Sequence, residues 1–181
     1  MKPTALFFGI AATVAASLAA AGCAPFDQAF APPPPSALSQ PIPASEIEWS
    51  RKSGNNTVSG TASLTAGGTT HTCAGQGANL GPDSAYGRAR MRAIFGNEIK
   101  GMRASSLGPV KFERDDPLYV STLRRTTCDA SGSFSFPRVP DGVWYVTTAV
   151  KWDGPGDRAE GGSMMKRVDV RGGKLVKVTL P

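Results

Sequence analysis

The residue pattern that most constrains this fold is an alternation of apolar and polar side chains with a period of two. In the longest run, the even positions from Trp144 to Trp152 are mostly apolar and would share one face. A period of two is typical of β-strands that bury one face, because successive side chains point to opposite sides. The same alternation predicts strands over 58–64, 118–123, 134–136, 144–152, 168–171 and 176–180.

Glycine-bearing turns separate many of these segments, as at Gly67-Gly68, Ser131-Gly132, Asp141-Gly142 and Gly172-Gly173. Many short strands with close turns and no strand–helix–strand repeat predict an all-β fold, an antiparallel β-sandwich of about seven strands. Residues 84–104 depart from the pattern. Met91, Ile94 and Phe95 have helical spacing, although the alternation of Arg88, Arg90 and Arg92 would equally suit an exposed strand. We favour a short helix in a long excursion between strands.

Residues 1–22 have the order of an export signal. A basic start is followed by an uncharged apolar run and by small residues ahead of Cys23. Ala20-Ala21-Gly22-Cys23 resembles the bacterial lipoprotein lipobox, with alanine where leucine is commonest. The resemblance implies acyl chains such as palmitate on Cys23, and Ala24 after it implies the outer membrane, facing the periplasm. Ordinary signal cleavage nearby and an uncleaved anchor are the alternatives.

Residues 23–46 differ in composition from the rest of the chain, with seven prolines between Ala24 and Ser45 and no hydrophobic period. Proline removes backbone donors and favours extended chain, so this segment is predicted to be a semi-rigid tether. The folded domain is then expected over 47–181. With Cys23 assigned to the anchor, Cys73 and Cys128 form an even pair in an oxidising compartment, which favours a disulfide.

Nine positions between Asp129 and Val146 carry a recognisable order: Asp129, Gly132, Phe134, Phe136, Val139, Pro140, Gly142, Trp144 and Val146. This order resembles the carboxypeptidase regulatory-like, transthyretin-like (prealbumin-like) β-sandwich family, with Trp144 where tyrosine is usual. Thr72–Gly75 and Ala78–Tyr86 are similar to bacterial exported members, and the resemblance covers about 58–180. It implies a transthyretin-like or immunoglobulin-like sandwich that serves as an accessory module without an active site.

Residue types that carry catalysis or bind metal are scarce. His71 is the one histidine, no G-x-S-x-G motif accompanies it, and zinc would need a Cys or His cluster. The loop from Asp153 to Glu160 has three carboxylates that calcium could use, but a solvated hairpin loop is favoured. We therefore predict no enzyme, no catalytic residue, no metal and no cofactor. A small periplasmic hydrolase using His71 or this loop is the alternative.

The formal net charge of +6 bears on the choice of partner. An exported protein is not expected to meet nucleic acid, so anionic lipid head groups or envelope polymers are the expected counter-charges. Arg88, Arg90 and Arg92 form the densest basic run and are candidate anion-binding residues, against the alternative of a solvated surface. The predicted function is a non-catalytic interaction or structural module, with an envelope protein or anionic polymer as partner. A carbohydrate-binding module is a further alternative, which would need Trp144 or Trp152 exposed.

Overall fold

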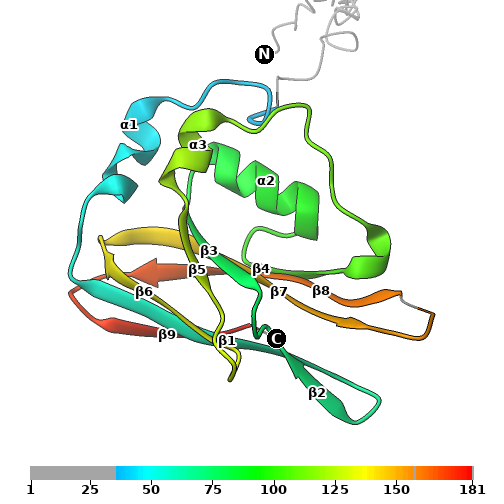
Figure 1. The fold of residues 1–181 in the computed structure, drawn as a ribbon. Coiled ribbons are helices and arrows are strands. Elements are labelled where there is room, and N and C mark those ends of the chain that lie inside the picture. The colour runs from blue at the N-terminus through cyan, green and yellow to red at the C-terminus, as the bar shows by residue number, and fades with distance from the viewer. Residues whose placement is uncertain (1–35, 157, 181) are drawn as a thin grey trace, which may run out of the picture. The chain divides into compact units, whose positions relative to one another are not determined.

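The computed structural model describes residues 36–156 and 158–180, which form an all-β sandwich with a layer of short helices on one side (Figure 1). The predicted signal, Cys23 and most of the predicted tether lie outside the described residues. The elements are α1 Ala44–Ile47, η2 Glu48–Arg51, β1 Asn56–Ala66, β2 Thr69–Thr72, β3 Gly77–Pro82, α2 Ala85–Phe95, β4 Lys100–Ala104, η3 Ser105–Leu107, α3 Pro117–Thr122, β5 Arg124–Thr127, β6 Ser133–Val139, β7 Gly142–Asp153, β8 Ala159–Val170 and β9 Leu175–Leu180.

The strands form two sheets. One has the order β2-β1-β6, with β9 also paired to β1, and the other has the order β4-β8-β7-β3-β5. Every pairing is antiparallel except β1–β9, which is parallel. The predicted sandwich is therefore confirmed, with nine strands in the described residues rather than about seven, because β4 and β5 extend the second sheet.

The core lies between the two sheets and is built from the alternating positions. Trp144, Val146 and Val150 of β7 are fully buried, and Val58 of β1 and Phe136 of β6 meet them from the other sheet. The predicted disulfide is present in this core, with an S–S distance of 2.11 Å and Cα atoms 5.8 Å apart. Because Cys73 follows β2 and Cys128 follows β5, the bond joins the two sheets.

The strand predicted over 118–123 is wrong, since residues 118–122 belong to α3 and only Arg124–Thr127 form a strand before Cys128. Asp116 accepts hydrogen bonds from the backbone amides of Leu118 and Tyr119, at 2.8 and 3.2 Å, and proline occupies the first helical position. This capping arrangement favours a helix start over the local period of two. The buried residues Tyr119 and Thr122 then lie three apart, on one helix face.

The excursion over 84–104 divides into a helix and a strand. The Ser84 hydroxyl caps α2 by accepting from the Gly87 amide at 2.9 Å, and Gly96 ends the helix in the left-handed region at φ 69°. The predicted helix is confirmed. The second half is β4, an edge strand on β8, and a Cβ on Gly101 would lie 2.7 Å from the Phe95 Cβ, so glycine lets α2 lie directly on the sheet.

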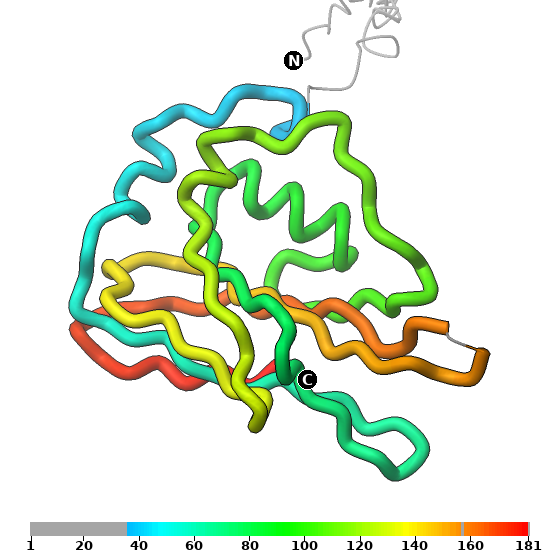
Figure 2. The backbone as a smooth tube through the Cα atoms, viewed as in Figure 1, coloured from blue at the N-terminus to red at the C-terminus, as the bar shows by residue number. Residues whose placement is uncertain are grey.

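The tether predicted over 23–46 extends too far, because its last residues belong to the folded unit. Ile42 and Ile47 are buried in a cluster with Tyr86 and Tyr119, and the Ile42 amide donates to the Asp116 carboxylate at 3.4 Å. Figure 2 shows this N-terminal segment running beside the helical layer before it descends to β1. The proline-rich composition of this segment gives no indication that a few of its apolar residues pack against a distant part of the chain.

In the described part of the chain, no helix has both the length and the apolar character to cross a membrane.

Candidate functional site

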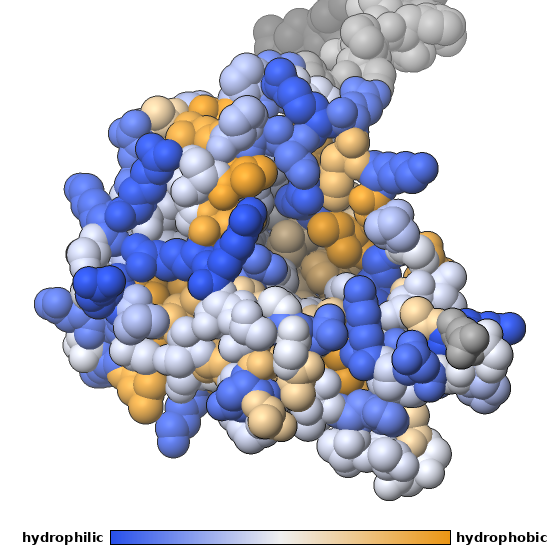
Figure 3. Space-filling view, viewed as in Figure 1, coloured by the Kyte–Doolittle hydropathy of each residue, from blue (hydrophilic) through white to orange (hydrophobic). Residues whose placement is uncertain are grey.

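A groove crosses the outer face of the five-stranded sheet, beneath the helical layer (Figure 3). Two adjoining lobes make it up, with volumes of about 320 and 440 Å³, and both are lined by Arg90, Ile94 and Ser163. The first lobe lies against α2 and α3, and the second lies against the segment 103–112. These volumes are in the range of small-molecule sites, which often combine an apolar wall with a few polar groups.

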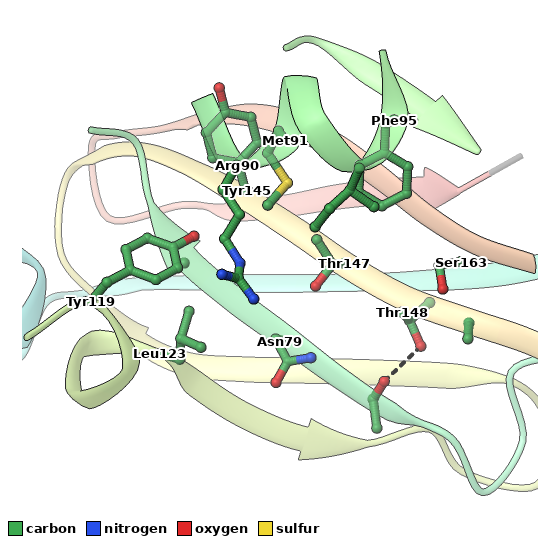
Figure 4. A pocket seen from close by; sticks show the side chains of 14 residues that line it. Asn79, Arg90, Met91, Phe95, Tyr119, Leu123, Tyr145, Thr147, Thr148 and Ser163 are labelled. Atoms are coloured by element: carbon green, nitrogen blue, oxygen red, sulfur yellow. Dashed lines mark hydrogen bonds between the residues drawn. The ribbon is translucent and has the colours of Figure 1, made fainter. Parts of the chain in front are cut away.

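The floor of the groove comes from the strand positions that point away from the core. On β7 these are Tyr145, Thr147 and Ala149, which alternate with the buried even positions. The pairing register places Asn79 of β3 opposite Thr147, and Ser163 of β8 opposite Ala149. Small polar side chains from three neighbouring strands therefore meet on one surface, as Figure 4 shows.

Three of these floor side chains are available to a ligand. Asn79, Thr147 and Ser163 are half-buried, and their side chains make no hydrogen bond to another described residue. An amide offers two donors and an acceptor, and each hydroxyl can do both. The floor can thus exchange several hydrogen bonds with a bound molecule that carries hydroxyl groups.

The walls of the first lobe are apolar and aromatic. Met91 of α2 is buried against Tyr145 and Met165, which fixes the helix on the sheet, and Ile94 and Phe95 continue the wall. Tyr119 of α3 closes the opposite side. Figure 4 shows Arg90 and Tyr119 reaching into the cavity from their two helices.

Arg90 occupies the junction of the two lobes and is held there by several contacts. Its guanidinium forms an ion pair with Asp115, and its carbon atom Cζ lies 4.1 Å from the centroid of the Phe112 ring. Nη1 also lies 3.5 Å from the Tyr86 hydroxyl, which it can donate to. An arginine fixed in this way presents a preset charge to the groove.

Two buried tyrosines, Tyr145 on β7 and Tyr119 on α3, have hydroxyls with raised pKa values. Burial raises the pKa of Tyr145 to about 12, with the Asp83 carboxylate acting in the same direction, and burial likewise raises the pKa of Tyr119. The Tyr145 hydroxyl is buried and makes no hydrogen bond within the described residues. Both phenols stay protonated well into the alkaline range, so Tyr119 presents a neutral hydroxyl to the groove.

The structure separates the three arginines predicted to bind an anion together. Arg88 pairs with Asp83 at 2.9 Å, Arg92 pairs with Glu98, and Arg90 pairs with Asp115. In a helix, Arg90 points to a different side from Arg88 and Arg92, whereas a strand would have aligned all three. Arg88 and Arg92 are four apart and share a helix side, but each pairs with a different carboxylate. Among the three, only Arg90 lines the groove.

The residues of the hydrolase alternative lie elsewhere. The His71 ring stacks on Trp152, with centroids 4.0 Å apart and planes at 11°, and its side chain makes no hydrogen bond to another described residue. Glu160 of the acidic loop accepts a hydrogen bond from Trp152 Nε1 at 2.9 Å. Among the residues that the structure describes, no group of three His, Cys, Asp or Glu side chains is placed to hold a metal ion.

Neither candidate tryptophan forms an open sugar platform, so the condition set from the sequence for a carbohydrate-binding module is not met, and a sugar in the groove would have to use other rings. Trp144 is fully buried, and its ring meets Trp49 edge-on at 5.0 Å, while one face of Trp152 lies against His71.

The sequence pattern does not identify the groove residues Asn79, Thr147 and Ser163, because the polar face of a strand has the same pattern whether it meets water or a cavity. The helical capping signals at Ser84 and Asp116 are the features that could have indicated a covered face.

A comparison with solved structures identifies a similar protein. It is a Pseudomonas aeruginosa protein proposed to bind carbohydrate, whose crystal structure is known. Its sequence is 27% identical to this chain, and the two structures superpose with a TM-score of 0.65. The match covers 77% of this chain and 96% of that one. No family model and no curated protein matches the chain.

Proposed function

We propose that this chain is a non-catalytic binding module that holds a carbohydrate in the groove beneath α2 and α3. The observation that carries the proposal is the groove itself, with its polar floor of Asn79, Thr147 and Ser163 and its apolar wall. The chain's similarity to a protein that is proposed to bind carbohydrate supports the same ligand class. Sugars offer both hydroxyl groups and C–H faces, so they suit a site with these two kinds of surface.

Each part of the groove has a role in this proposal. The Asn79 amide can donate to one sugar hydroxyl and accept from another, and the hydroxyls of Thr147 and Ser163 can bind neighbouring ones. Phe95 offers apolar ring surface to the C–H face, and the hydroxyl of Tyr119 adds a neutral donor at the wall. Because the floor lies on paired strands, the backbone positions that carry its side chains are fixed before a ligand arrives.

The module is proposed to act at the cell envelope, held by lipid on Cys23 at the outer membrane. The lipobox-like sequence of residues 20–23 supports this placement, and the resemblance to carboxypeptidase regulatory-like domains supports a non-catalytic, accessory role. Two or more acyl chains are enough for stable attachment to a bilayer. Mass spectrometry of the mature protein should find an acylated Cys23 at its N-terminus, and an unmodified N-terminus beyond Cys23 would rule the anchor out.

Calorimetric titration of the full-length gene product, purified in detergent, tests the binding function. The panel holds neutral and uronate-containing oligosaccharides, and saturable binding of at least one is expected. Mass spectrometry of the recovered sugars should find them uncleaved. Lack of binding across the panel would contradict the proposal, and cleavage that His71→Ala abolishes would favour the hydrolase.

A further inference from the structure

We infer that the groove's ligand is an acidic carbohydrate, whose carboxylate lies in the second lobe among Arg90, Arg103 and Lys151. This inference rests on the proposed function and narrows its ligand class. The three cationic side chains come from three elements, α2, β4 and β7, and all line the second lobe. Register places Arg103 opposite Ser163, so the cations adjoin the polar floor.

The charge of the second lobe is not balanced by its own lining. Among the described residues that line either lobe there is no aspartate or glutamate. Asp115 offsets the charge of Arg90, which leaves Arg103 and Lys151. Within the described residues, neither of these two forms an ion pair.

Arg103 is oriented without being neutralised. Its Nε donates to the Gly108 carbonyl and its Nη2 to the Leu107 carbonyl, both at 3.1 Å. These bonds hold the guanidinium in place and leave Nη1 without a protein partner among the described residues. An oriented guanidinium with a remaining donor suits a carboxylate oxygen, and charge-assisted bonds of this kind are stronger than neutral ones.

The two lobes therefore differ in the chemistry that they offer. The first has neutral hydroxyl and amide groups beside apolar rings, and the second has an excess of positive charge. Ser163 and Arg90 border both lobes, so one ligand can reach from one lobe to the other. A uronic acid sugar carries hydroxyls and a carboxylate on the same ring, which matches this division.

A matched pair of sugars tests the inference. Oligogalacturonate and its methyl ester have the same ring and length, and only the first is charged. We expect the full-length protein in detergent to bind the acid about tenfold more tightly at ~0.05 M salt. This preference should shrink toward ~0.5 M salt, because added ions screen exposed charges.

The variant Lys151→Gln locates the charge effect. It should weaken binding of the acid about fivefold, which is the range of an exposed ion pair, and weaken binding of the uncharged ester by less than about twofold. Lys177→Gln on β9 is the matched control, since Lys177 is exposed on the other sheet, and it should bind like the wild type. Equal binding of acid and ester would overturn this inference and leave the proposed function standing. Binding of neither sugar, nor of any other in the panel, would overturn both.

Discussion

Removing the Cys73–Cys128 disulfide is expected to lower the free energy of unfolding by about 4 kcal/mol. The two cysteines are 55 residues apart, and opening a loop of that length returns conformational entropy to the unfolded chain. The loop contains α2, β4 and α3, which are the walls of the groove. A loss of this size is a large share of the roughly 5–15 kcal/mol typical of a domain.

Urea unfolding of the double variant Cys73→Ala/Cys128→Ala, compared with the wild type by linear extrapolation, measures this loss. Reductant should lower the wild-type midpoint and leave that of the double variant where it is. A loss below ~1 kcal/mol would show that the loop elements are ordered without the bond.

Replacing Ile47 with alanine is expected to cost about 3 kcal/mol, the usual range for a large aliphatic side chain lost from a packed site. Ile47 is fully buried in a cluster with Ile42, Tyr86 and Tyr119. The cluster joins the N-terminal segment to α2 and α3, so this variant measures how firmly that segment belongs to the folded unit.

Ile99→Ala is the matched control, because Ile99 is 56% exposed and its truncation should change stability by less than ~0.5 kcal/mol. Both free energies come from the same urea unfolding measurement. If Ile47→Ala were as harmless as the control, the segment before β1 would behave as the tether that its proline content suggests.

The sandwich could be predicted because alternation is a local sequence pattern, and the disulfide could be predicted from the number of cysteines. The even positions of β7 alternate clearly enough to mark a buried face. Once Cys23 is assigned to the predicted anchor, the two remaining cysteines leave one pairing. The helix α2 was also detectable from the spacing of Met91, Ile94 and Phe95.

The rest depends on contacts between distant residues. Ile42 looks isolated between two prolines, and only its packing on Tyr86 and Tyr119 makes it a core residue. The groove depends on the same kind of information. Thr147 lies on the polar face of its strand, and nothing near it in the sequence shows that two helices cover that face.

The most direct test of the binding groove is to fill it and measure affinity. Ala149 lies on the floor opposite Ser163, so Ala149→Met should occupy space that the ligand needs without entering the core. Ser135→Met on β6, exposed on the other sheet, is the control. Calorimetry with oligogalacturonate should show affinity at least about tenfold weaker for Ala149→Met, with Tm little changed, and wild-type affinity for Ser135→Met. Wild-type affinity in a folded Ala149→Met protein would show that the ligand binds elsewhere.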